Sequence, residues 1–215
     1  MAADNVTVRL ERALTLPLSE ADVRALRVGD MVRLDGEIVI TAGLPTHQRM
    51  LDHLSAGRPL PTEFDGGTLF HLGSYSREVA GQFEVLYMNP TTSTRFNSFM
   101  PTLIRRLGLR AIGGKGGLDR ASVAAMQECG CVYLSFLGGG AALHTSAIRS
   151  VVSVHWPDLI FQYRLARLQV VGLGPLTVAI DAHGHSIYDE LAENASERLP
   201  HILQQLRRER GPPSA

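Results

Sequence analysis

Two successive units of strand, glycine loop and helix constrain the fold of this chain most. Residues 109–112 form a short apolar strand, followed by the glycine loop 113–117 and a helix that Asp119 can cap. Residues 131–136 form a second apolar strand, followed by the glycine triplet 138–140 and another helix. This alternation is typical of βαβ units in a parallel sheet. We therefore predict an α/β fold with its glycine loops at a common edge.

The composition is that of an ordinary globular protein. The chain has 215 residues, of which 45% are hydrophobic and 20% charged, and no repeat, low-complexity block or linker divides it. We predict a single domain spanning residues 1–215. Lysine plus arginine equals aspartate plus glutamate, 21 each, so we expect no nucleic acid or membrane partner, and any anion site must be local.

The first residues contain an acid and no apolar core, so we expect no signal peptide, and no run approaches the roughly 18 apolar residues of a membrane span. The two cysteines, Cys129 and Cys131, are one residue apart. That spacing suits neither a disulfide framework nor a metal site, so we interpret both as buried thiols. These features favour a cytoplasmic protein.

Several local patterns predict the elements of the N-terminal third. Residues 6–16 alternate as a strand does, and Ser19 can cap a short helix. Residues 31–42 form two apolar runs around Asp35 and Gly36, which predicts a two-residue hairpin. A helix should then run from Pro45 to about residue 56, with a buried stripe of Met50, Leu51 and Leu54 that leaves His47 and Arg49 elsewhere.

The rest of the chain has weaker signals. Residues 57–81 suggest loops around one strand at 68–72, and residues 83–88 a further strand. Apolar residues between Phe96 and Leu107 recur at helical spacing, and Pro101 should kink or split that helix. Toward the C-terminus we expect an alternating segment over 161–171, a strand at 176–180 and a polar helix over 186–206. His183 and His185 could bind a metal, but a third ligand is lacking, so we favour a structural role.

The stretch 89–118 carries the most chemistry. Its threonine turn offers hydroxyls, amides and Arg95 to a carboxylate, although the same residues can simply cap a helix beside a surface arginine. Lys115 has glycines on both sides, so backbone and ammonium could both approach a ligand, although an exposed turn lysine would look alike. We predict that the two loops return to one edge of the sheet. The patterns for a nucleotide triphosphate and a dinucleotide are both absent.

Four motifs in order resemble one family: PTTSTRFNSF, GGKGGL, GGGAAL with VHWPDL, and DAHGHSIY. They are similar to the β subunit of two-subunit class I fumarases and L-tartrate dehydratases, which is equivalent to the C-terminal domain of single-chain class I fumarases. The resemblance covers nearly the whole chain. It implies a swivelling β/β/α three-layer domain that closes over a partner.

The resemblance also implies a hydro-lyase that adds water to, or removes it from, a small hydroxy or unsaturated dicarboxylic acid such as fumarate, malate or tartrate. In that family a separate α subunit holds a [4Fe-4S] cluster on three cysteines, and its open iron takes the departing hydroxyl as a Lewis acid. We therefore expect an enzyme that is active only as a hetero-oligomer with an α subunit, with no metal bound by this chain.

The resemblance also implies roles for individual residues within the matching motifs. Thr91 matches the threonine proposed to remove the proton, Arg95 a carboxylate-binding arginine, and Lys115 the lysine of the glycine loop. Fixed positive charge would stabilise the dianionic enolate, whereas a threonine hydroxyl is a poor base unless a cation or an anionic relay favours its alkoxide. The candidate catalytic residues are Thr91 and Lys115, and the candidate substrate-binding residues are Arg95, Thr92, His47, Gly114 and Gly116.

One departure concerns the substrate. Where the family usually has Thr-Ala-Arg-Asp-Ala-Ala-His-Lys-Arg, residues 41–49 are TAGLPTHQR, so Gly43 replaces a carboxylate-binding arginine. Loss of such a contact, roughly 1.5 to 3 kcal/mol, predicts an altered substrate. Residues 71–75, HLGSY, also differ from the usual Gly-Pro. The alternative is a diverged, non-catalytic protein that binds a carboxylate or scaffolds a partner, against which the presence of Thr91, Arg95 and Lys115 argues.

Overall fold

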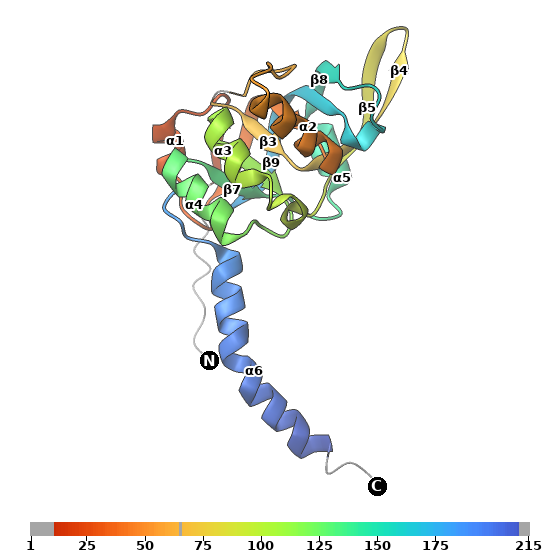
Figure 1. Cartoon of the computed structure of the whole chain (residues 1–215). Coiled ribbons are helices and arrows are strands. Elements are labelled where there is room, and N and C mark those ends of the chain that lie inside the picture. Colours follow the sequence, from red (N-terminus) through yellow and green to blue (C-terminus); the bar gives the residue numbers. More distant parts are fainter. Residues whose placement is uncertain (1–10, 65, 211–215) are drawn as a thin grey trace.

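The computed structural model describes residues 11–64 and 66–210, and a seven-stranded sheet lies at its centre (Figure 1). The strand order is β1-β2-β3-β6-β7-β9-β8, and β4 and β5 form a separate hairpin. The strands are β1 Glu11–Thr15, β2 Met31–Ile40, β3 Thr68–Phe70, β4 Leu72–Val79, β5 Gln82–Pro90, β6 Ala111–Gly114, β7 Val132–Ser135, β8 Ile148–His155 and β9 Leu165–Ile180.

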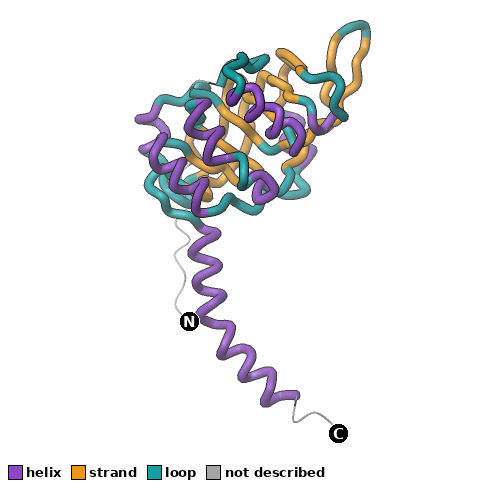
Figure 2. The backbone as a smooth tube through the Cα atoms, in the orientation of Figure 1, coloured by secondary structure: helices purple, strands orange, loops and turns teal. Residues whose placement is uncertain are grey.

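Helices α2, α3 and α4 form a layer on one face of the sheet, and α6 extends away from the body (Figure 2). The helices are α1 Glu20–Arg24, α2 Leu44–Ser55, α3 Met100–Leu107, α4 Arg120–Cys129, α5 Ala141–Ser146 and α6 Ile187–Arg210, with 3-10 turns η1 Ser93–Phe96 and η2 Phe161–Tyr163. Among the described residues, no helix is both long enough and apolar enough to cross a membrane.

Two hydrophobic clusters hold these layers together. Met50 of α2, Leu103 of α3 and Met126 of α4 are fully buried in the cluster between the helices and the sheet. A second cluster gathers apolar side chains of β2, β7 and β9, including Leu34 and Leu168. β2 pairs with its neighbour β3 and also with β9, which lies near the other end of the strand order. The sheet therefore curves until β9 lies beside β2. The second cluster fills this curved sheet.

The predicted α/β fold and the first of the two predicted βαβ units are confirmed, but the second unit is wrong, because α5 leads to β8, which pairs antiparallel with β9 and not with β7. Strands β3, β6 and β7 are parallel neighbours, and α4 connects the last two. Asp119 caps α4 by accepting a hydrogen bond from the Ser122 amide at 2.9 Å, and Ser19 begins α1 with a capping box. Pro101 lies in the first turn of α3, so the predicted helix is split there. The swivelling three-layer architecture and the single domain stay predictions.

The hairpin predicted at Asp35 and Gly36 is wrong, because β2 continues through both residues. The Asp35 carboxylate accepts a hydrogen bond from the Gly172 amide at 2.6 Å, and the pairing of β2 with β9 shifts register beside it. These two residues therefore form a bulge in a long strand rather than a turn. Of the strand predicted over residues 6–16, β1 is confirmed, and residues 6–10 lie outside the described residues.

Other boundaries also differ from the sequence prediction. β9 is one strand of 16 residues where a break after 171 was expected, and β4 and β8 were missed. The buried positions of β4 alternate as expected for a strand, but two of them are the polar residues Ser74 and Ser76, which hides the apolar pattern. His47, predicted to lie off the buried stripe of α2, is completely buried.

Candidate functional site

The carboxyl ends of four parallel strands meet at one edge of the sheet. There β2 leads to Gly43, β3 to His71, β6 to Lys115 and β7 to the loop containing Gly138. In α/β sheets this edge is where ligands bind, because several loops converge there with exposed backbone amides. The structure thus gathers, from segments far apart in the sequence, the loops that sequence analysis singled out.

Backbone hydrogen bonds join the threonine turn to the glycine and lysine loop. The Lys115 amide donates to the Thr91 carbonyl at 3.1 Å, and the Ser93 amide donates to the Lys115 carbonyl at 2.8 Å. A Cβ on Gly114 would lie 2.2 Å from Ser93 Oγ, so this close approach requires glycine. The prediction that the two loops return to one edge is confirmed.

Two positive charges flank this junction. Arg95 donates to the Thr91 hydroxyl at 3.3 Å, and its guanidinium lies 5.8 Å from the centre of the Phe96 ring. Among the described residues, neither Arg95 nor Lys115 has an acidic partner, and both are exposed. A site with two unneutralised cations, in a chain of zero formal net charge, suits an anion.

Lys115 is distinctive in a way that sequence analysis missed. It is the single lysine of the chain, because the other 20 of the 21 basic residues are arginine. Its side chain passes Gly138, where an added Cβ would lie 4.0 Å from Lys115 Cδ. Lysine offers a compact, mobile ammonium that arginine cannot imitate. A count of lysines alone would have strengthened the case for this position.

A pocket of about 450 Å³ opens beside Thr91 and Arg95. Asn89 also lines it, and the buried Asn89 Oδ1 has no hydrogen-bond partner within the described part of the chain. Gln162 and Tyr163, from η2, form another part of its wall. Sequence analysis missed Gln162 and Tyr163 as site residues, because only folding brings η2 beside the end of β5. It did not single out Asn89 within the stretch 89–118.

The position at which the resemblance implies an arginine, Gly43, is closed in this chain. A Cβ on Gly43 would lie 2.4 Å from Thr46 Oγ1 and 2.7 Å from Tyr163 Cβ. The hydroxyls of Thr41 and Thr46 both donate to the Tyr163 carbonyl, which holds η2 against this loop. The space beside Gly43 is therefore filled by Thr46 and Tyr163, and this wall carries no positive charge.

Two buried histidines lie under the site. Phe96, from the threonine turn, stacks on His47 with ring centres 4.1 Å apart and lies 4.4 Å from the His71 ring centre. His71 Nδ1 is 2.8 Å from Ser93 Oγ, and Tyr133 donates to the same oxygen at 2.8 Å. His47 is therefore placed to support the turn that carries Arg95, whereas direct contact with a substrate was expected from the sequence.

Both histidines are neutral near pH 7. Burial lowers the pKa of His47 to about 4, and burial together with the proximity of His47 lowers the pKa of His71 well below its ordinary value. His47 Nδ1 donates to the Gly43 carbonyl at 2.7 Å, which leaves His47 Nε2 as an acceptor. Because Ser93 accepts from Tyr133, its own proton can go to His71 Nδ1, which leaves the His71 Nε2–H as a donor.

The two Nε2 atoms complement each other. Both are buried, and neither has a hydrogen-bond partner among the described residues. The His47 and His71 ring centres are 5.2 Å apart.

The cysteines do not form a cluster site. Cys131 is fully buried and Cys129 half-buried, and burial raises the pKa of both thiols, which disfavours the thiolates that metals bind. Within the described residues, no group of three histidine, cysteine or acidic side chains is placed to hold a metal. The residues present therefore do not fit an iron–sulfur cluster as its ligands.

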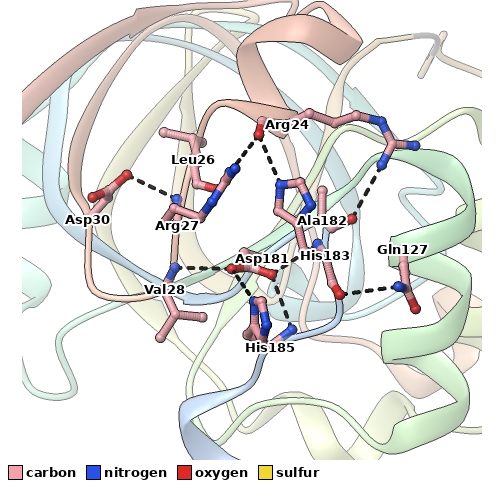
Figure 3. Close-up of polar contacts among 10 residues, drawn as sticks. All are labelled: Arg24, Leu26, Arg27, Val28, Asp30, Gln127, Asp181, Ala182, His183 and His185. Atoms are coloured by element: carbon pink, nitrogen blue, oxygen red, sulfur yellow. Dashed lines mark hydrogen bonds and ion pairs between the residues drawn. The ribbon is translucent and has the colours of Figure 1, made fainter.

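His183 and His185 belong to a loop organised by a buried carboxylate (Figure 3). Asp181 accepts hydrogen bonds from the amides of His183 at 2.9 Å and His185 at 3.1 Å, and from the His185 ring at 3.1 Å. Burial would raise the pKa of Asp181, but these hydrogen bonds hold it below its ordinary value. His183 Nε2 donates to the Arg24 carbonyl at 3.0 Å, so its ring ties this loop to α1.

Comparison with known proteins places the chain in a family. The family model described as "Fumarase C-terminus" matches residues 1–191. The chain belongs to this family. It is 33% identical over 187 residues to a Methanocaldococcus jannaschii protein named "Putative L(+)-tartrate dehydratase subunit beta", a match that covers 86% of this chain and 95% of that protein.

Two further relatives agree with this membership. The L(+)-tartrate dehydratase subunit beta of Escherichia coli K12 is 29% identical over 197 residues, which cover 92% of this chain and 96% of that protein. A Geobacillus stearothermophilus protein named "Putative fumarate hydratase class I" is 30% identical over 191 residues, which cover 87% of this chain and 36% of that protein. The chain is thus similar to a whole β subunit and to part of a longer protein.

Proposed function

We propose that this chain is the β subunit of an iron–sulfur hydro-lyase that reversibly adds water to, or removes it from, a small hydroxy or unsaturated dicarboxylic acid. The names of its relatives support this reaction class. The observation that carries the proposal is the backbone junction that joins Thr91 and Lys115, beside a pocket lined by Arg95. A cytoplasmic location belongs to the same proposal.

In the proposed reaction, dehydration breaks a C–H bond next to a carboxylate and the C–O bond on the neighbouring carbon, and hydration reforms both. Removal of the proton leaves an enolate with two negative charges, which Arg95 and Lys115 stabilise as fixed cations. Arg95 donates to the Thr91 hydroxyl at 3.3 Å, and a guanidinium in that place favours the alkoxide that could accept the proton. Thr92, Gly114 and Gly116 contribute the backbone around the bound carboxylate.

His47 is assigned a positioning role in this proposal. Its ring stacks on Phe96 beneath the turn, so it fixes the direction in which Arg95 leaves the 3-10 turn. A neutral imidazole suits this role, because a buried charge beside Arg95 would repel the guanidinium.

The substrate is proposed to differ from fumarate and malate at one end. Tyr163 and Thr46 fill the space next to Gly43, and the neighbouring wall is formed by the neutral residue Gln162. A carboxylate at that end would find no cation, whereas a neutral polar group could hydrogen-bond to an amide. The end held by Arg95 and Lys115 keeps its carboxylate.

The α subunit is proposed to hold the cluster and to cover this edge of the sheet. Exposed aromatic rings lie beside the pocket: Tyr75 stacks on Tyr87 at 6.0 Å and meets Phe161 edge-on at 5.6 Å. All three remain more than a third exposed, at 42%, 44% and 37%. Apolar patches of this kind mark protein interfaces. We propose that a swivelling motion of the domain closes the site against this partner.

The test is reconstitution of the pair. The chain is coexpressed with a candidate α subunit that contains three cysteines, sought first in an adjacent reading frame. The cluster is rebuilt anaerobically, and hydration or dehydration is measured on fumarate, malate, tartrate and 2-hydroxy acids with one neutral end. We expect turnover to be fastest on an acid with one neutral end. Hydration of fumarate at the rate of an ordinary class I fumarase would refute the altered substrate.

Lys115 is tested in the same assay. Lys115→Ala should reduce turnover by roughly 10²-fold or more, since it removes one charge that stabilises the transition state, while assembly with the α subunit is unchanged. Arg149→Ala, an exposed arginine of β8, is the matched control and should keep full activity. Binding of the carboxylate without turnover by the reconstituted wild-type pair would favour the non-catalytic alternative.

A further inference from the structure

Helix α6 leaves the body of the protein and makes few contacts with it (Figure 1). It is 24 residues long, and every residue from 190 to 209 is exposed. The family model ends at residue 191, so most of α6 lies beyond the part of the chain that this model matches. Pro200 interrupts the hydrogen bonds of this helix, and most helical stability in proteins comes from packing of an apolar face, so an unpacked α6 indicates a partner.

An apolar seam runs along α6. It consists of Ala192, Ala195, Leu199, Ile202 and Leu206, which follow one another at steps of three, four, three and four. This spacing is that of the central positions of a coiled coil. Leu199 is 52% exposed and Ile202 is 44% exposed, although both are large aliphatic side chains. The seam is therefore the face that a partner helix would cover.

We propose that the partner is α6 of a second copy of this chain, packed antiparallel as a two-helix coiled coil. The charges of α6 support this choice of partner and direction. Residues 187–197 contain four acids and no lysine or arginine, whereas residues 198–210 contain four arginines and one glutamate. Antiparallel pairing brings the acidic half of each helix beside the basic half of the other, and parallel pairing would bring like charges together.

The N-terminal half of α6 contacts the body of the protein through two of its acidic residues. Arg120 of α4 pairs with Glu193 at 3.2 Å and with Asp189 at 4.0 Å, which ties the acidic half to the body. Glu190 and Glu197 have no basic partner within the described residues. They lie on the face of Gln204, away from the seam, so they contribute to the charge of the acidic half without direct ion pairs to the second copy.

The sizes of the seam residues support the same direction. In an antiparallel pair, Ala192 of one helix can lie opposite Ile202 of the other while Ala195 lies opposite Leu199, so each layer contains one small and one large side chain. A parallel pair would place alanine on alanine and leave voids there. The layers from 192 to 202 span about 15 Å at 1.5 Å per residue.

Light scattering of the purified full chain tests the proposal. At 23.4 kDa per chain, an assembly of two has a mass of about 47 kDa. We expect that mass for the wild type at about 100 µM and half of it for Leu199→Glu/Ile202→Glu. The control His201→Glu/Gln204→Glu adds the same charge on the opposite face and should stay dimeric. Unchanged thermal unfolding of the body shows that each variant is folded.

Crosslinking tests the direction. Ala192→Cys and Ile202→Cys variants, both in a Cys129→Ser background, are purified separately and oxidised alone or mixed. Antiparallel pairing predicts efficient disulfide formation only in the mixture, where positions 192 and 202 share a layer. A monomeric wild type, a dimer that survives the seam substitutions, or crosslinks within one variant alone would overturn the proposal. These measurements need no enzymatic activity, so they stand apart from the proposed function.

Discussion

The buried histidines under the site make the stability of the protein depend on pH. Burial lowers the pKa of His47 from 6.5 to about 4, so between these values the unfolded chain binds a proton that the folded chain does not. The free energy of unfolding therefore falls as the pH drops below about 6.5. At 1.36 kcal/mol for each pKa unit, the contribution of His47 is a loss of about 2 kcal/mol at pH 5. His71 acts in the same direction.

Urea denaturation followed by circular dichroism at pH 7.5 and pH 5.0 measures this loss. His47→Gln removes the titrating ring, so the variant should lose about 2 kcal/mol less than the wild type between the two pH values. His201→Gln changes an exposed histidine of α6 and should retain the full wild-type loss. Parallel pH dependence of the wild type and His47→Gln, within about 0.5 kcal/mol, would refute the reasoning.

Two further substitutions test the packing around the site. Gly43→Ala should lower the free energy of unfolding by about 1 to 3 kcal/mol, since its Cβ would lie 2.4 Å from Thr46 Oγ1, whereas Gly73→Ala, with its nearest contact at 3.4 Å, should be nearly neutral in the same urea titration. Asp119→Ala should cost about 1 kcal/mol by removing the cap of α4, and Asp119→Asn should restore most of it; equal stability of the two would argue against the cap.

Local chemistry made part of the structure predictable. Ser19 and Asp119 cap helices through hydrogen bonds to amides three residues away, and Pro101 lies in the first turn of α3. Such signals are contained within one turn of chain, so no knowledge of the fold is needed. The meeting of the threonine turn and the Lys115 loop was also predicted from sequence, although β5, which leads into the turn, lies in the separate antiparallel hairpin and not in the parallel sheet.

The other predictions were wrong because the structure there depends on contacts between segments that are distant in the sequence. Asp35 and Gly36 have the sequence of a turn, but the Gly172 amide and the pairing with β9 keep them in one strand. His47 was expected outside the buried stripe, and it is Phe96, nearly 50 positions later in the chain, that buries it. Tyr163 joined the pocket for the same reason, since hydrogen bonds from Thr41 and Thr46 fold η2 back over the end of β2.

The packing at Gly43 makes some changes to this pocket easier to reach by mutation than others. A single substitution to arginine would have to displace Thr46 and the main chain at Tyr163, which hold each other in place. Introducing a positive charge here thus requires several coordinated changes, each costly alone. Gln162 lines the pocket without that constraint, so its replacement is the shorter route to a new specificity. Directed evolution of this chain should start there.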